Sequence, residues 1–225
     1  IKNGKLMAEN IEYGDKGVKF DCDGMRISLG IPGVFSVYNA LVAIGICKEC
    51  GIAEDVIERA LSKATGVKGR AEVVDCGGDY TLLIDYAHTP DALENVLKTL
   101  REIAPDHELI CLFGCGGDRD KSKRPEMAQI AQKLADRIIV TSDNSRTEKT
   151  SDIMADIKAG LELSGRAKSL FIEDREQAIR TAIMIAGQGA TSLLAGKGHE
   201  TYQITGKEKR HFDEKEIISN YINEL

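Results

Sequence analysis

The feature that most restricts the fold is an alternation of short apolar runs with amphipathic helical segments, which starts near residue 70 and continues toward the C-terminus. The apolar runs occupy residues 80–85, 109–113, 137–141, 169–172 and 191–195. Short continuous strands that alternate with helices are typical of a parallel sheet covered on both faces. The sequence therefore predicts an α/β domain built on a mostly parallel sheet.

Helical periodicity fills the intervals between these runs. Apolar residues recur at helical spacing near residues 93–100, 127–134 and 178–183, and a further helix is predicted over 151–163. Asp174, followed three residues later by Gln177, has the pattern of an N-terminal cap. A short hairpin around Gly206 and a last helix from Asp213 complete the predicted elements.

Residues 1–68 have a different pattern. Short apolar alternations at 7–13, 18–22 and 25–29 predict an antiparallel meander, and helices are predicted over 36–50 and 53–64. Three strands and two helices offer little to close a core, so we expect this part to be the end of a larger domain. We expect residues 69–225 to fold independently, whereas residues 1–68 depend on contacts with other parts of the protein.

Charge, hydropathy and cysteine usage exclude several classes. The net charge of -6 argues against a general nucleic-acid binder, and no apolar run approaches the ~18 residues of a membrane helix. The six cysteines include a Cys47 and Cys50 pair, but no second such pair or nearby histidine pair completes a metal site. We expect buried or incidental thiols and a cytoplasmic protein. The start at Ile1, without a signal-peptide pattern, suggests a piece of a longer protein.

Four polar clusters follow directly after predicted strands. They occupy residues 85–90, 114–120, 142–146 and 196–200. Ligands of open parallel sheets bind outside the carboxyl ends of the strands, where loops and helix N-termini gather. The sequence therefore predicts a ligand site that carries both acidic and basic side chains.

The glycine-rich cluster at 114–117 matches neither a dinucleotide fingerprint nor a phosphate-binding loop, and a tight turn is an alternative to a ligand contact. Basic side chains opening a helix oppose its macrodipole, and an anionic ligand would relieve this cost. A solvated basic face is the other interpretation. The side chains in question are Arg119, Lys121, Lys123 and Arg124.

Single residues in the other clusters leave alternatives open. The guanidinium of Arg146 suits a carboxylate, but the side chain also fits a surface position. Lys197, between two glycines, fits either a phosphate contact or a flexible turn. His88 either orients a ligand or caps the following helix, and Asp85 at a strand end needs a polar partner. No nucleophile with its base emerges from the spacing, so no catalytic residue is assigned.

Six motifs in this order closely resemble the diaminopimelate-adding branch of the Mur ligase family: GVFSVYNALVA from residue 33, Gly69-Arg70, DYAHTPDALE, FGCGGDRDKSKRPEM, TSDNSRTE and AGKGHETYQ. The resemblance implies a Rossmann-like C-terminal domain at 69–225, preceded at 1–68 by the incomplete end of a central ATPase domain. It also implies a further UDP-binding domain in the complete enzyme.

The resemblance implies an ATP-dependent amide ligase of peptidoglycan synthesis. Such an enzyme joins meso-diaminopimelate to UDP-MurNAc-L-Ala-D-Glu through an acyl phosphate, with ATP and Mg²⁺ as cofactors. It further implies that the adenine, phosphates and ribose of ATP meet Asn39, Arg70 and Asp85, respectively. The amino acid would bind, with Glu200 facing an amine and the arginines facing carboxylates, to Arg119, Asp143, Asn144, Ser145, Arg146, Gly196 and Glu200.

Three departures from the family pattern stand beside this resemblance. Ser36 and Ser145 replace the usual asparagine and proline, and a serine at 145 leaves the recognition loop freer. A GxxGK[ST] loop and the expected metal-ligand region are absent, so we expect the Mg²⁺ ligands to lie elsewhere and this chain alone to be inactive. The alternatives are a related Mur ligase adding lysine or another amino acid, a folylpolyglutamate synthase, and a non-catalytic binding module. The DNSR and GKGHE clusters argue against the first two.

Overall fold

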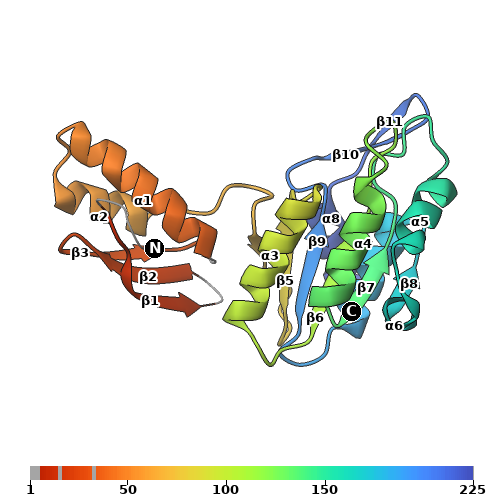
Figure 1. The fold of residues 1–225 in the computed structure, drawn as a ribbon, viewed down its shortest axis with the longest axis horizontal. Coiled ribbons are helices and arrows are strands. Elements are labelled where there is room, and N and C mark those ends of the chain that lie inside the picture. The colour runs from red at the N-terminus through yellow and green to blue at the C-terminus, as the bar shows by residue number, and fades with distance from the viewer. Residues whose placement is uncertain (1–5, 15–16, 32–33, 225) are drawn as a thin grey trace. The chain divides into compact units, whose positions relative to one another are not determined.

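A computed structural model describes residues 6–14, 17–31 and 34–224, and Gly33, which opens the first motif, lies outside them. The chain forms two compact units, Ile1–Val67 and Lys68–Leu225 (Figure 1). Within the described residues, no helix is long and apolar enough to cross a membrane, and all six cysteines are unpaired.

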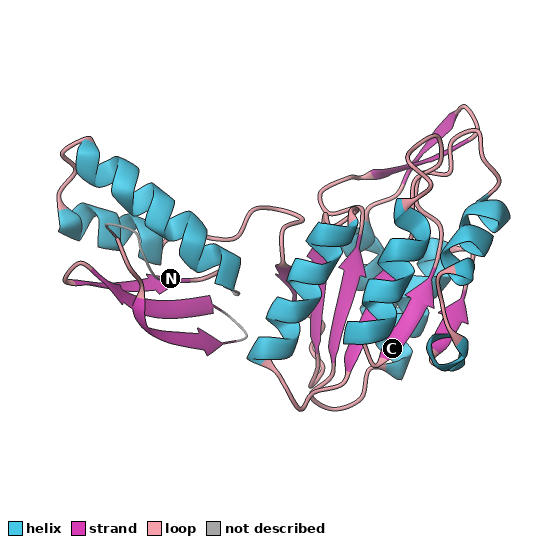
Figure 2. Cartoon of the chain, in the orientation of Figure 1, coloured by secondary structure: helices cyan, strands magenta, loops and turns pink. Residues whose placement is uncertain are grey.

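The first unit is a three-stranded antiparallel meander covered by two helices (Figure 2). The order β1-β2-β3 and the antiparallel pairing confirm the predicted meander. Alternate side chains of β2 and β3 are buried, as expected of strands with one covered face. The elements are β1 (Glu9–Gly14), β2 (Gly17–Cys22), β3 (Met25–Leu29), α1 (Val34–Glu49) and α2 (Glu54–Ser62).

The core of this unit is larger than the sequence suggests. Twelve buried apolar residues form one cluster, with Phe20, Ile27 and Ile44 at 0% exposure. The expectation of little core was therefore wrong, because α1 contributes four residues to the cluster. The opposite face of α1 carries Tyr38, Val42 and Ile46, each at least half exposed. A helix that is apolar on both faces is usually covered on both.

The second unit is built on a six-stranded sheet of order β4-β5-β9-β6-β7-β8. Five strands are parallel, and β4 pairs antiparallel with β5 at one edge. Figure 1 shows α3 and α4 in front of this sheet and α8 behind it. The strands are β4 (Glu72–Val74), β5 (Thr81–Asp85), β6 (Leu109–Phe113), β7 (Arg137–Val140), β8 (Ser169–Phe171) and β9 (Thr191–Ala195).

Helices cover the sheet on both faces and confirm the predicted fold class. On one face, α7 and α8 pack Ile179, Ala182 and Ile218 against Ile84, Leu112 and other strand residues. Asp174 caps α7 by accepting a hydrogen bond from the Gln177 N–H at 3.0 Å, as predicted. The helices are α3 (Pro90–Ile103), α4 (Lys123–Leu134), α5 (Thr150–Ala159), α6 (Leu163–Ala167), α7 (Arg175–Ile185) and α8 (Glu214–Glu224).

The predicted helix over 151–163 is shorter in the structure. The N–H groups of Gly160 and Leu161 donate to carbonyls three residues earlier in the chain, and not four as in an α-helix. The Glu162 N–H donates to the side chain of Gln132 on α4. The helix therefore ends at Ala159, and α6 follows as a separate turn. The hairpin of β10 (Tyr202–Thr205) and β11 (Glu208–His211) turns at Gly206, whose φ of +60° suits glycine.

Candidate functional site

The carboxyl ends of four parallel strands meet at one edge of the second unit. Asp85 pairs in register with Ala195, and Phe113 pairs with both Ala195 and Val140. These strand ends therefore lie at one level, and the four polar clusters begin there as predicted. Gly196 links two of them, because its N–H donates to the Asp85 carbonyl at 3.0 Å.

The glycine-rich loop after β6 packs against the loop after β7. A Cβ at Gly114 would lie 2.5 Å from the Thr141 carbonyl oxygen, and a Cβ at Gly117 would lie 1.9 Å from that of Ser145. The Gly117 N–H also donates to the Asn144 carbonyl at 2.9 Å. These glycines are needed for close backbone approach between two loops of the protein itself, which accounts for them without a phosphate.

The loop after β7 is held on its other side by the β10–β11 hairpin. The Arg146 N–H donates to the Ile204 carbonyl at 3.2 Å, and the Gly206 N–H donates to the Arg146 carbonyl at 2.6 Å. Arg146 has a φ of +50°, a conformation that is strained for a residue with a side chain. Ser145 is 1% exposed. Hydrogen bonds to the hairpin therefore hold this loop with serine, not proline, at position 145.

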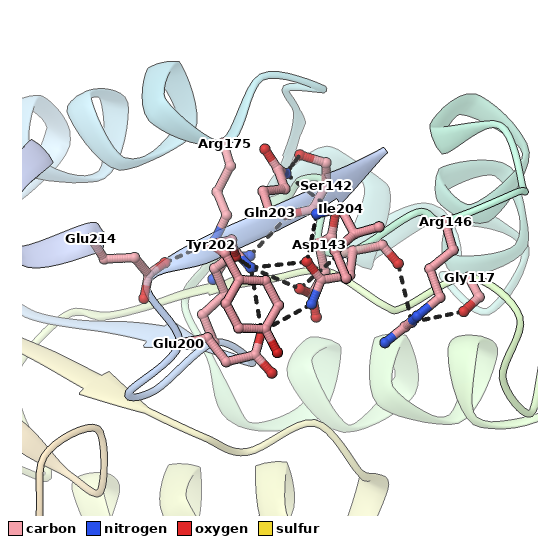
Figure 3. Close-up of polar contacts among 12 residues, drawn as sticks. Gly117, Ser142, Asp143, Arg146, Arg175, Glu200, Tyr202, Gln203, Ile204 and Glu214 are labelled. Atoms are coloured by element: carbon pink, nitrogen blue, oxygen red, sulfur yellow. Dashed lines mark hydrogen bonds and ion pairs between the residues drawn. The ribbon is translucent and has the colours of Figure 1, made fainter. Parts of the chain in front are cut away.

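Asn144 joins the acidic and basic groups of the site, Glu200 and Arg146, which are labelled in Figure 3. Its side-chain Nδ2 donates to Glu200 Oε2 at 2.9 Å, and its backbone carbonyl accepts from Arg146 Nη1 at 3.3 Å. Arg146 Nη1 also donates to the Gly117 carbonyl at 2.8 Å. A guanidinium and a carboxylate therefore flank one asparagine at the edge of the sheet.

The remaining residues predicted for the amino acid adjoin this group. A Cβ at Gly116 would lie 3.0 Å from Arg146 Nη1 and 3.8 Å from Arg119 Cγ, so both arginines border Gly116. Asp143 Oδ1 accepts from the Asn144 N–H at 2.7 Å. Gly196, with a φ of +116°, would place a Cβ 3.5 Å from Asp143 Oδ2.

The basic cluster at the start of α4 is neutralised largely by the protein's own carboxylates. Arg124 is fully buried and bonds Glu148 through both terminal nitrogens, at 2.8 and 3.0 Å, and Asp156 at 2.8 Å. Lys121 lies 3.0 Å from Glu148, and Lys123 donates to the His88 carbonyl. Carboxylates of the protein itself therefore relieve Lys121 and Arg124 without an anionic ligand.

Glu148 gives this cluster a pH dependence. Hydrogen bonds from Arg124, the Asp118 N–H and Lys121 lower the pKa of Glu148 from 4.5 to about 2. A carboxyl with a depressed folded-state pKa stabilises the fold fully above its unfolded pKa and loses that contribution as pH falls toward its folded pKa. The stability that Glu148 contributes is therefore present above pH 4.5 and decreases between pH 4.5 and 2.

Glu148→Gln is expected to remove this contribution. The urea midpoint of the variant should lie below that of the wild type at pH 6, and the difference should shrink as pH falls from 4.5 toward 2. Glu224→Gln, at an exposed carboxylate paired with Arg180, serves as the control. A difference that stays constant from pH 6 to pH 3 would contradict the assignment.

A second group of predicted residues lies at the β5 end. Each carboxylate oxygen of Asp85 accepts one backbone N–H at 2.7 Å, from Ala71 and from Ala87, which leaves each oxygen a further lone pair. Burial raises the pKa of Asp85 despite these bonds. The Arg70 guanidinium lies 4.8 Å from the centre of the Tyr86 ring.

His88 and Asn39 complete the predicted set. His88 Nδ1 lies 2.8 Å from the Tyr86 carbonyl oxygen, and Thr89, not His88, caps α3 by accepting from the Ala92 N–H. Asn39 is an exposed residue of α1 in the first unit. Among the described residues, no group of three or more His, Cys, Asp or Glu side chains is placed to hold a metal ion.

Three buried cations near the site escaped sequence analysis or were read as exposed. Lys197 is 0% exposed, so it does not belong to an exposed, flexible turn. Arg175, also 0% exposed, donates to the carbonyls of Ser142 and Ala195 and to Glu214. Arg124 is the third. Their partners are distant in sequence, and no local signal marks such pairs.

Comparison with known proteins gives one family and one closely similar group. The family model described as "Mur ligase, glutamate ligase domain" matches residues 69–198. A protein of Clostridium acetobutylicum named UDP-N-acetylmuramoyl-L-alanyl-D-glutamate--2,6-diaminopimelate ligase 1 is 44% identical, over 98% of this chain and 46% of its own length. A Fusobacterium nucleatum protein named as such a ligase is 45% identical, over 99% and 45%. The chain thus spans about half the length of these relatives.

Two solved structures of ligases are similar in fold to this chain, which covers about half of each. A structure titled as a UDP-N-acetylmuramoyl-L-alanyl-D-glutamate--2,6-diaminopimelate ligase has a TM-score of 0.73 and 34% identity, and the match covers 100% of this chain and 46% of that one. The UDP-N-acetylmuramate-alanine ligase MurC of Thermotoga maritima has a TM-score of 0.67 at 21% identity, over 100% and 46%. This second similarity concerns the fold alone.

Proposed function

The chain belongs to the Mur ligase family, and on that premise we propose that it is the amino-acid-binding part of an ATP-dependent ligase that adds meso-diaminopimelate to UDP-MurNAc-L-Ala-D-Glu. In this proposal, residues 69–225 are the C-terminal domain and residues 1–68 are the end of the ATPase domain. The enzyme acts in peptidoglycan synthesis in the cytoplasm. Its activity needs the remainder of the ligase.

The observation that carries the proposal is the pair of opposite charges held by Asn144. Meso-diaminopimelate has two carboxylates and two amines, so its site needs both signs of charge at one edge. Arg146 and Arg119 border Gly116 and supply guanidinium groups for a carboxylate. Glu200, bonded to Asn144 at 2.9 Å, supplies a carboxylate for an ammonium group. Asp143, Ser145 and Gly196 shape the same loops.

Arg70 and Asp85 fit a nucleotide at the neighbouring strand end. Asp85 retains free lone pairs for a ribose hydroxyl, and Arg70 over Tyr86 carries the charge that a phosphate needs. We assign Asn39 to the adenine on resemblance alone. Mg²⁺ would offset charge on the phosphates of ATP, and no described residue of this chain is assigned to it.

The proposal is tested with the full-length ligase that contains this chain. Phosphate release is measured with ATP, UDP-MurNAc-L-Ala-D-Glu and either meso-diaminopimelate or lysine. Release that depends on meso-diaminopimelate, with lysine far weaker, is the expected result. Equal use of lysine, or no dependence on either amino acid, would overturn the proposal.

The 225-residue chain alone is expected neither to hydrolyse ATP nor to form the amide bond. The sequence has no GxxGK[ST] loop, whose backbone N–H groups and lysine hold the transferred phosphoryl group. A coupled phosphate-release assay measures this, with the full-length ligase as the positive control. Turnover by the chain at the rate of the full-length enzyme, in a preparation free of other ATPases, would contradict it.

A further inference from the structure

The side chain of Lys197 is fully buried and lies among residues of the site, of which Figure 3 labels Asp143, Glu200 and Tyr202. Its Nζ donates to the Tyr202 carbonyl at 2.6 Å and to Asn144 Oδ1 at 3.3 Å. Asp143 Oδ1 and Glu200 Oε2 each lie 3.5 Å from the same nitrogen. One buried ammonium therefore contacts three residues of the proposed amino-acid site.

The orientation of the Asn144 amide is fixed by Lys197 together with a backbone N–H group. An ammonium group has hydrogen-bond donors and no acceptor. The Ile204 N–H donates to the same atom of Asn144 at 2.9 Å, so two donors face one side of the amide. That side must carry the oxygen. The Asn144 Nδ2 then faces Glu200 and donates to its Oε2.

This orientation determines what Glu200 offers to a ligand. Its Oε2 is held by Asn144 and lies near Lys197. Its Oε1 has no hydrogen-bond partner among the residues that the structure describes. Turning the Asn144 amide over would present its oxygen to Glu200 and repel it. The position of the available carboxylate oxygen therefore depends on Lys197 through Asn144.

The charges of the cluster leave room for one more cation. Asp143, Glu200 and Glu214 are acidic, and Lys197 and Arg175 are basic. Burial lowers the pKa of Lys197, and the Asp143 and Glu200 carboxylates act in the opposite direction. Arg175 pairs with Glu214, whereas the Asp143 and Glu200 carboxylates share the single Lys197 ammonium, each at 3.5 Å. An ammonium group on Glu200 Oε1 would supply a second cation to these two carboxylates.

We propose that Lys197 is a positioning residue whose buried ammonium fixes the Asn144 amide and so leaves Glu200 Oε1 available to an ammonium group of the incoming amino acid. The inference rests on the proposed function, because the amino acid is taken from it. Lys197 does not touch the amino acid in this account. It acts through Asn144.

Lys197→Met tests the proposal, because methionine fills similar space without the charge. Calorimetry of the 225-residue chain with meso-diaminopimelate is expected to show a Kd raised about tenfold or more, the effect of misplacing a hydrogen bond to a charged group. In the full-length ligase, KM for the amino acid should rise while KM for ATP stays unchanged. A folded variant whose Kd lies within about threefold of the wild type would overturn the proposal.

Lys168→Met is the matched control. Lys168 precedes β8, at the opposite edge of the sheet, and its Nζ donates to the carbonyls of Gln132 and Ala135 at 2.7 and 2.6 Å. Lys168→Met removes two hydrogen bonds to backbone carbonyls and leaves the contacts of the site unchanged. The Kd for meso-diaminopimelate is expected to be unchanged. A Kd that rises as much as in Lys197→Met would overturn the proposal, since loss of stability alone would then explain both.

A measurement on the wild type covers the case in which Lys197→Met does not fold. In ¹⁵N-edited NMR spectra, the side-chain NH₂ of Asn144, identified by its loss in Asn144→Asp, should be protected from solvent exchange without ligand. Rapid exchange would overturn the proposal. This readout is independent of the proposed function: a wild type that binds no meso-diaminopimelate contradicts that function, whereas the protection of Asn144 tests the Asn144–Glu200 hydrogen bond on which the positioning by Lys197 depends.

Discussion

Replacing Arg146 with alanine in the full-length ligase is expected to lower the preference for meso-diaminopimelate over lysine by about 10- to 100-fold, the range for losing a charged hydrogen-bonded pair. The two amino acids differ by one carboxylate at the far end, so a selective site needs a cation there. Arg146 is committed through Nη1 to two carbonyls, of Gly117 and Asn144. Its other nitrogens have no hydrogen-bond partner among the described residues and remain for a ligand carboxylate.

The kcat/KM ratio for the two amino acids measures this preference. Arg166→Ala is the matched control, because Arg166 also donates to two backbone carbonyls, of Leu161 and Lys158, but precedes β8 at the opposite edge of the sheet. It should leave the ratio unchanged. Arg119→Ala should lower the ratio partly, since Arg119 borders the same glycine. An unchanged ratio in Arg146→Ala would refute its role as the selector.

Arg175→Met is expected to destabilise the second unit by about 3–5 kcal/mol, the usual cost of removing one partner of a buried ion pair. Arg175 is 0% exposed and bonds Glu214, whose side chain is 1% exposed, at 2.8 Å. Its other nitrogens donate to the Ser142 and Ala195 carbonyls at 3.0 and 2.9 Å. Without the guanidinium, a buried carboxylate and two carbonyls lose their donor.

The urea midpoint measures this loss, and Arg180→Met is the control on the same helix. Arg180 pairs with Glu176 and Glu224 near the surface, where such pairs contribute about 0–1 kcal/mol. Arg175→Met should therefore shift the midpoint several times further. Equal shifts in the two variants would show that the buried pair has no special role.

The fold could be predicted from the sequence where local signals agreed. The strands at Leu109–Phe113 and Thr191–Ala195 are continuous apolar runs, and the start of α7 is marked by Asp174. The edge strand Glu72–Val74 was missed because three half-exposed residues carry no periodicity. The predicted helix over 151–163 ran past the end of α5 at Ala159, and the short helix Leu163–Ala167 was not predicted as a separate element.

The location of the candidate site could be predicted from the sequence, but the buried charged residues inside it could not. Asn144, Arg146 and Glu200 follow the carboxyl ends of two parallel strands, β7 and β9, of one sheet, which brings them to the same edge. The burial of Lys197 depends on the hairpin that follows it, and that of Arg175 depends on a glutamate 39 residues away. From the sequence alone, a lysine between two glycines is expected in a surface turn. Only the position of the hairpin, whose Tyr202 carbonyl accepts from Lys197, shows that the lysine is buried.

An NMR titration of the 225-residue chain with meso-diaminopimelate and, separately, with lysine tests most directly whether this edge is the amino-acid site. The account predicts that meso-diaminopimelate shifts the backbone resonances of Asn144, Arg146, Gly196 and Glu200, and that lysine shifts them far less at the same concentration. Shifts confined to other parts of the sheet, or equal shifts with lysine, would contradict it.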